Sequence, residues 1–133
     1  MSVLVVEDNA DVRNSLTRIL KTAGFDVDVA EHGLAALVLV QQHAYEVIVC
    51  DIMMPVMDGV RLYELLRHQY PEAARRVVFA SAWFDDGDVR GFVERTSRPV
   101  LRKPFDIDEF LRTVREVAER PPPAEPPLSE DPA

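Results

Sequence analysis

The stretch from Val47 to Gly59, VIVCDIMMPVMDG, indicates the fold and raises the question of function. Its first four residues are apolar and mostly β-branched, which is typical of a strand buried on both faces of a parallel sheet. Asp51 follows at once, so a carboxylate stands where a buried strand ends. Pro55 and the Asp58-Gly59 pair then predict a turn into a helix. A carboxylate at the end of a buried strand suggests a functional role. The residues that follow the other predicted strands indicate what that role is.

Short apolar runs alternate with helical patterns along the chain. The runs lie at residues 3–6, 25–30, 46–50, 76–80 and 98–101. The helical patterns occupy residues 10–23, 33–43, 58–69, 85–95 and 106–119. Strict alternation with short connections predicts an α/β fold of the (βα)5 doubly wound type, a five-stranded parallel sheet with helices on both faces. The run FDVDVA at 25–30 alternates polar and apolar residues, so we expect it at an edge of the sheet.

The composition excludes several classes of protein. The chain has 133 residues, 47% apolar and 29% charged, which is typical of one soluble domain with a full core. Its net charge of −8 argues against binding nucleic acid or an anionic membrane surface. The single cysteine, Cys50, has no internal disulfide partner and is expected in the core of a protein from a reducing compartment. The opening MSVLVVEDN resembles no leader sequence, so we expect a cytoplasmic protein.

Two parts of the chain differ in composition. Residues 1–120 carry the alternating pattern and are expected to form the domain. Residues 121–133, PPPAEPPLSEDPA, hold six of the ten prolines and three acids, Glu125, Glu130 and Asp131. This segment has too little apolar surface to order itself, so the sequence predicts a disordered or polyproline-type tail or linker.

Polar side chains follow four of the predicted strands. They are Glu7 and Asp8 after the first strand, Asp51 after the third, Ser81 after the fourth and Lys103 after the fifth. In parallel sheets of this kind the functional site lies at the carboxyl ends of the strands. Three carboxylates held together there repel one another, and Mg²⁺ relieves such repulsion. Acids, a cation, a hydroxyl and an ammonium group together predict a phosphoryl-transfer site in which an aspartate is the nucleophile.

The motifs VLVVEDN, VIVCDIMMPVMDG, FASA and LRKPF together resemble the response-regulator receiver family of two-component signalling, the CheY-like superfamily. Spacings of 43, 30 and 22 residues separate Asp8, Asp51, Ser81 and Lys103 in turn. The resemblance covers residue 3 to about residue 119. It implies a flavodoxin-like sheet of strand order 2-1-3-4-5 in a bacterial, cytoplasmic phosphoprotein.

The resemblance also implies a role for each matching residue in the acidic site. Asp51 would be the phosphoacceptor. Glu7 and Asp8 would hold Mg²⁺ or Mn²⁺ together with Asp51, and the backbone carbonyl of Met53 would be a further ligand. The phosphatases that also use an aspartyl phosphate need a second acid two residues after the nucleophile. Met53 occupies that position here, which argues against turnover of a small substrate.

Further roles follow for the residues after the fourth and fifth strands. Ser81 would be the hydroxyl switch and Lys103 the phosphate-binding lysine, with a cis peptide bond before Pro104. The chain has 13 arginines and two lysines, so a lysine retained beside Arg102 indicates that a compact ammonium group is needed.

The implied partner is a sensor histidine kinase or a histidine phosphotransfer protein, with no direct contact to nucleic acid or membrane. Phosphoryl transfer to Asp51 and its autodephosphorylation would be self-catalysed. The surface of residues 85–95, 98–101 and 106–119 would repack and contact an output partner or a second copy. Two alternatives stay open: a docking module that does not depend on phosphorylation, and the receiver part of a hybrid kinase or longer regulator.

Two features depart from the family pattern. The family commonly has an aromatic residue three positions before the lysine, and here that residue is Val100. The helix at 33–43 is apolar nearly all round, with Leu34 and Val38 on its expected outer face. These two side chains are either tolerated surface residues or part of a docking or dimer patch.

Trp83, two residues after Ser81, stands where the family tunes access to the phosphoryl group. We predict that this indole, together with Met53, slows the attack of water or restricts the partner. Trp83→Ala should therefore change the rate of phosphorylation or of dephosphorylation, measured by following the phosphorylated fraction with time. Two unchanged rates would contradict the prediction.

Overall fold

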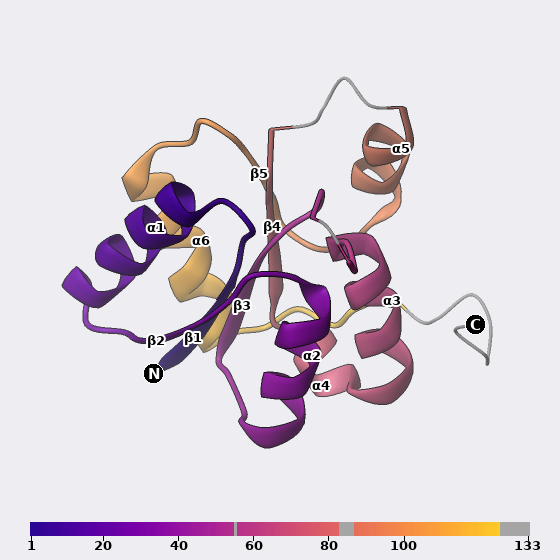
Figure 1. Ribbon diagram of the computed structural model, residues 1–133, viewed down its shortest axis with the longest axis horizontal. Helices are drawn as coiled ribbons and strands as arrows, with labels where there is room; N and C mark the ends of the chain where they lie inside the picture. Colours follow the sequence, from indigo (N-terminus) through magenta and orange to yellow (C-terminus); the bar gives the residue numbers. More distant parts are fainter. Residues whose placement is uncertain (55, 83–86, 126–133) are drawn as a thin grey trace.

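The computed structural model describes residues 1–54, 56–82 and 87–125. Five parallel strands form one sheet in the order β2-β1-β3-β4-β5, which confirms the predicted fold class and the edge position of the 25–30 run (Figure 1). The strands are β1 (Ser2–Val6), β2 (Asp26–Ala30), β3 (Val47–Asp51), β4 (Val77–Ser81) and β5 (Val100–Arg102). The helices are α1 (Ala10–Thr22), α2 (Gly33–Gln42), α3 (Gly59–Gln69), α4 (Pro71–Ala74), α5 (Gly87–Arg95) and α6 (Ile107–Glu119).

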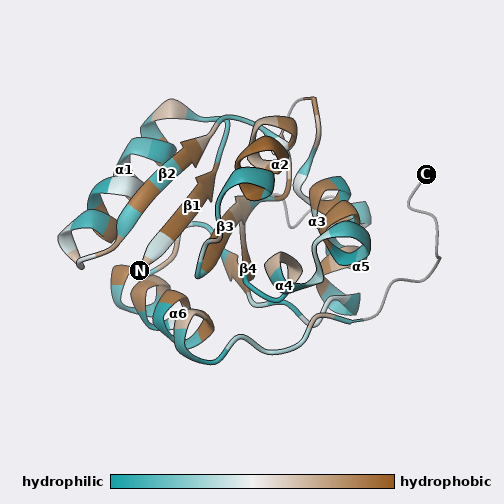
Figure 2. Cartoon of the chain, turned by 90° about the horizontal axis from the view of Figure 1, so that it is seen from below, coloured by the Kyte–Doolittle hydropathy of each residue, from teal (hydrophilic) through white to brown (hydrophobic). Residues whose placement is uncertain are grey.

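Helices cover both faces of the sheet, and each face has its own core. On one face, α1 and α6 bury Leu16, Leu20, Phe110 and Val114 against β-strand valines. On the other face, α2 to α5 pack against the opposite side chains of the same strands, where an aromatic group is prominent. Figure 2 shows the apolar strands between the two helical layers. Because both faces are covered, β1, β3 and β4 consist of buried residues almost throughout.

Side-chain caps fix where the helices begin. Asn9, Asp58 and Asp106 each accept a hydrogen bond from a backbone N–H of the first turn. His32 caps α2 in the same way, since its Nδ1 accepts from the Ala35 N–H at 3.1 Å. This capping bond gives His32 a structural role at the start of α2.

Gly59 allows α3 to begin directly against the end of β3. Its N–H donates to the Ile52 carbonyl at 2.8 Å. A Cβ atom at this position would lie 2.3 Å from the Asp51 carbonyl oxygen, well inside the contact distance. Because Gly59 has no side chain, the start of α3 can lie directly against the Asp51 carbonyl group. The Asp58-Gly59 pair therefore helps to position Asp51 as well as to form the turn.

Residues 121–125 differ from the predicted flexible tail. They lie near the amino-terminal ends of the strands, at the end of the sheet opposite to the one that carries Asp51. From there they pass from α6 toward α3 (Figure 1). Arginine side chains of the domain donate to their carbonyl groups, and the partly buried Ala124 packs against the core on the α3 side. Composition alone did not predict this, because the donors come from residues far away in the sequence. Residues 126–133 of the predicted tail are outside the described residues.

Leu34 and Val38 lie on the outer face of α2, as predicted, with 46% and 47% of their surfaces exposed. The short helix α4 was not predicted. Over the described part of the chain, no helix has the length and apolar character needed to span a membrane.

Gly59→Ala should lower the free energy of unfolding by about 1–3 kcal/mol, because the added methyl group must push the Asp51 backbone or the start of α3 aside. Gly87→Ala is the matched control, since a Cβ atom there meets nothing within 4 Å and alanine favours a helix. Urea unfolding of the two variants checks the prediction. Equal stabilities would show that the close approach at Gly59 does not constrain the turn.

Candidate functional site

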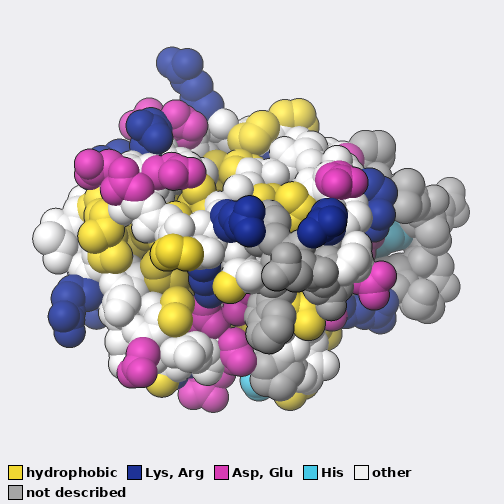
Figure 3. All heavy atoms as spheres, turned by 90° about the horizontal axis from the view of Figure 1, so that it is seen from above, with side chains coloured by type: hydrophobic (Ala, Val, Ile, Leu, Met, Phe, Trp, Pro, Cys, Tyr) yellow, Lys and Arg dark blue, Asp and Glu magenta, His cyan; other side chains and the backbone are white. Residues whose placement is uncertain are grey.

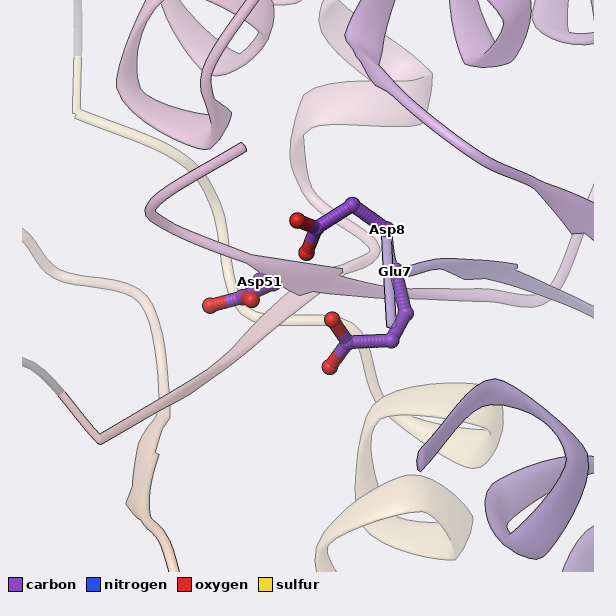
Figure 4. A group of neighbouring side chains, drawn as sticks. All are labelled: Glu7, Asp8 and Asp51. Carbon is purple, nitrogen blue, oxygen red and sulfur yellow. The ribbon is translucent and has the colours of Figure 1, made fainter. Parts of the chain in front are cut away.

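Three carboxylates converge at the carboxyl ends of two neighbouring strands. Glu7 and Asp8 follow β1, and Asp51 is the last residue of β3, which pairs with β1. One oxygen from each carboxylate lies within 4.8 Å of the others. Figure 4 shows the three side chains around a common space. Glu7 and Asp51 are buried while Asp8 is exposed, so the group opens to solvent on one side.

The loop that carries Glu7 and Asp8 is held by a residue that sequence reasoning missed. Arg13, one turn into α1, donates from Nη1 to the Glu7 carbonyl at 3.0 Å and also lies 3.9 Å from Glu31. The Asn9 N–H donates to Glu7 Oε2 at 3.3 Å. An arginine six residues after an acid is a weak signal in a sequence with 13 arginines. Only the backbone geometry shows that it orients the acidic loop.

Lys103 supplies the positive charge of the site. Its ammonium group contacts Glu7 Oε1 and lies 3.8 Å from Asp51 Oδ2. Its backbone N–H donates to the Ser81 carbonyl at 2.9 Å, which joins the segment after β5 to the end of β4. The Lys103–Pro104 peptide bond is cis.

Burial and neighbouring charges shift the pKa values of the two buried acids, Asp51 and Glu7, in opposite directions. Burial raises the pKa of Asp51 to about 7; Lys103 opposes this rise and the Glu7 carboxylate adds to it. Burial also acts to raise the pKa of Glu7, but the hydrogen bond and charge of Lys103 hold it below the ordinary value. Lys103 is thus mainly paired with Glu7. The negative charge of an ionised Asp51 is therefore only partly neutralised by Lys103.

The donor set fits a hard divalent cation. Oδ1 of Asp51 is buried and has no hydrogen-bond partner among the described residues. Asp51 is one of the residues that line a cleft of about 450 Å³, together with Glu7, Asp8, Asn9, Val12, Met53, Met54 and Lys103. Figure 3, which looks onto this end of the sheet, shows acidic side chains beside hydrophobic and basic ones. Carboxylate oxygens with room for water are what Mg²⁺ prefers, so Glu7, Asp8 and Asp51 could hold it.

Comparison with known proteins agrees with this geometry. The profile of the response regulator receiver domain matches residues 3–115. The chain belongs to that family. It is a receiver domain of the kind used in two-component systems.

Relatives of this receiver domain occur in kinases and in transcriptional regulators. It is 33% identical over 121 residues to the sensor kinase CckA of Brucella abortus, covering 90% of this chain and 13% of that kinase. It is 37% identical over 118 residues to the transcriptional regulatory protein PrrA of Mycobacterium tuberculosis, covering 89% of this chain and 50% of that regulator. The chain thus spans about half the length of the PrrA regulator and a much smaller share of the CckA kinase.

The Francisella response regulator 1452 receiver domain is a similar solved structure. Its sequence is 34% identical, the TM-score is 0.76, and the match covers 90% of this chain and 97% of that one.

The remaining predicted residues of the receiver domain lie around β4 and β5. Ser81 is fully buried at the end of β4, one residue beyond Ala80, which pairs with Asp51. Val100 begins β5 opposite Phe79 and is partly buried against the core on that face. Trp83 is outside the described residues, so its predicted effect stays a prediction.

Without metal, stability should fall as the pH rises from about 4 to about 7 and then level off, because burial raises the pKa of Asp51 to about 7 in the folded state and an ordinary aspartate ionises near 4. We expect a loss of about 1 kcal/mol between pH 6 and pH 8. Urea unfolding in a chelator at both pH values measures it. Asp51→Asn should lack this component, and an equal loss in that variant would contradict the assignment to Asp51.

Proposed function

We propose that Asp51 accepts a phosphoryl group and that the domain acts as a two-state switch. The observation that carries this proposal is the buried Asp51 carboxylate, with one oxygen unpaired among the described residues, beside Glu7, Asp8 and Lys103. A carboxylate of this kind is costly for the folded state and has no packing role. It lines a cleft instead, through which a phosphodonor could reach it.

The reaction requires little covalent work from the protein. A carboxylate oxygen of Asp51 forms a bond to the phosphorus atom of a phosphohistidine. The bond between phosphorus and the imidazole nitrogen breaks, and the electron pair stays on that nitrogen, which takes up a proton. The Lys103 ammonium group, already 3.8 Å from Asp51, stabilises negative charge on the phosphoryl oxygens.

Glu7, Asp8 and Asp51 would hold Mg²⁺ or Mn²⁺, with the Met53 carbonyl as a further ligand. When bound, the ion would supply positive charge to the carboxylates and to the phosphoryl group. Asp51, whose pKa burial raises, would then be held ionised at neutral pH as the nucleophile. Arg13 holds the backbone of Glu7 in place through its hydrogen bond to the Glu7 carbonyl group.

Phosphorylation would change the surface formed by α5, β5 and α6. It replaces one carboxylate charge by about two charges and adds strong acceptor oxygens. We expect Ser81 and Lys103, at the ends of β4 and β5, to move toward them. Because Val100 takes the place of the family's aromatic residue, the response cannot depend on an aromatic rotamer at that position. We propose that it involves a displacement of β5 and its flanking loops.

The proposed donor is a sensor histidine kinase or a histidine phosphotransfer protein. The relatives in a sensor kinase and in a transcriptional regulator support either context, as part of a hybrid kinase or of a longer regulator. A cytoplasmic location fits the one cysteine, which is a buried thiol. The exposed Leu34 and Val38 on α2 are a further candidate contact for a partner or a second copy.

Incubation with a small acyl phosphate and Mg²⁺ should add one phosphoryl group to the wild-type chain and none to Asp51→Asn, as read from intact mass. Chelation of the cation should abolish the addition. Continuous release of inorganic phosphate far above the amount of protein would favour a phosphatase. A chain that stays unmodified would favour a docking module independent of phosphorylation.

A further inference from the structure

The segment 121–125 is bound by the domain through its main chain. Arg75 Nη2 donates to the Pro121 carbonyl at 2.9 Å, and Arg98 Nη1 donates to the Pro122 carbonyl at 2.9 Å. Arg67 Nε donates to the Glu125 carbonyl at 3.0 Å. Proline has no N–H and prefers extended conformations, so carbonyl groups are what such a segment offers for recognition. Three arginines from separate parts of the chain provide the matching donors.

Glu125 binds in a pocket of donors beside this row. Its carboxylate accepts from the Ser97 N–H at 3.1 Å, from the Ser97 hydroxyl and from the Thr96 hydroxyl at 3.2 Å. Arg67 Nη1 lies 3.8 Å away, and the Tyr63 hydroxyl is near the same carboxylate but has no hydrogen-bond partner among the described residues. Burial alone would raise the pKa of Glu125, but hydrogen bonds, chiefly from Ser97, lower it to about 2. The pocket is therefore selective for an ionised carboxylate.

The domain side of this contact is buried when the segment is in place. Arg98 is 4% exposed and Arg67 is 7% exposed. Each donates to the segment, and Arg98 also donates to the Val77 carbonyl at 3.0 Å. These exposures hold with the segment in place, so undocking would exchange its hydrogen bonds to the two guanidinium groups for bonds to water. The segment supplies these acceptors, so the two surfaces are complementary in both charge and hydrogen bonding.

We propose that the end of the domain opposite Asp51 is a docking site for the chain's own segment 121–125, recognised through Glu125, and that docking restrains the loop 96–99. The occupant is the segment of the same molecule. Its chemistry is that of an acidic, proline-flanked extended peptide.

The restrained loop leads directly into β5, the strand that the proposed switch would displace. Pro99 accepts a hydrogen bond from the Phe79 N–H at 2.9 Å, and β5 begins at the next residue. β5 has three residues, and Lys103 follows it. A contact that fixes Ser97 thus acts on the same short strand as the phosphoryl site, from its other end.

A packed aromatic group connects the same regions. Tyr63, next to Glu125, makes edge-to-face contacts with Phe79 and Phe92 at centroid distances of 5.5 and 6.1 Å. This part of the inference rests on the proposed function: if phosphorylation displaces β5 or α5, it changes the affinity for the docked segment. By linkage, the docked segment then changes the affinity of the site for a phosphoryl group by the same factor.

Hydrogen exchange of the full-length chain tests the docking without any phosphodonor. Glu125→Gln should speed the exchange of the Ser97 amide about tenfold, the size expected when a hydrogen bond to a charged group is lost. Glu119→Gln is the matched control, because it removes the same charge from the exposed end of α6. Wild-type exchange in Glu125→Gln, or an equal increase in Glu119→Gln, would overturn the proposal.

A double-mutant cycle shows whether the two groups act together. Ser97→Ala and Glu125→Gln should be non-additive in the stability of the chain, since both change the hydrogen bond between the Ser97 hydroxyl and the Glu125 carboxylate. Additive effects would overturn recognition through Glu125. Ser97 protection should also be independent of protein concentration. A fall on dilution would show that the segment comes from a second copy and would overturn docking within one molecule.

Beryllofluoride with Mg²⁺, a phosphoryl mimic, tests the coupling. We expect it to change Ser97 exchange about threefold or more in the wild type and to bind Glu125→Gln with altered affinity. Binding with no change at Ser97 in the wild type and equal affinity for both chains would overturn the restraint on the switch. Failure of the mimic to bind at all would contradict the proposed function, while the exchange experiment still decides the docking.

Discussion

The structure depends on placing one buried carboxylate, Asp51, next to two other acids. Burial and the Glu7 charge both disfavour its ionised form, and Lys103 compensates only in part. A parallel sheet makes this arrangement possible, because the ends of β1 and β3 are fixed side by side by their backbone pairing. The two helical layers then provide enough packing to tolerate the cost. The ionised form of Asp51 is therefore disfavoured in the folded chain. A bound cation or a phosphoryl group would change the charge balance around it.

Local features of the sequence were enough to predict the fold and the convergence of the acids. Continuous apolar runs predict buried parallel strands, and the alternating run at 25–30 predicts the edge strand. Once the sheet is parallel, residues that follow different strands have to meet at one edge. Glu7, Asp8, Asp51 and Lys103 do meet there. This part of the prediction succeeded because it needed only periodicity and topology.

Contacts between distant residues could not be predicted in this way. Arg13 supports the acidic loop through a backbone carbonyl, which leaves no pattern in the sequence. The docking of residues 121–125 depends on Arg67 and Arg98, which are 58 and 24 residues from their acceptors. Val56 adopts a φ of 69°, a left-handed value that a β-branched residue does not predict. Each of these features follows from tertiary structure and not from local preference.

The central claim is that Asp51 is the nucleophile, and chemical trapping tests it most directly. Borohydride reduces an aspartyl phosphate to homoserine, so peptide mass spectrometry of the trapped, phosphodonor-treated chain locates the modified residue. The account predicts homoserine at position 51 and a loss of this product when the cation is chelated. Trapping at another acid, including Glu7 or Asp8, or no trapped product from a chain that gains a phosphoryl group, would contradict it.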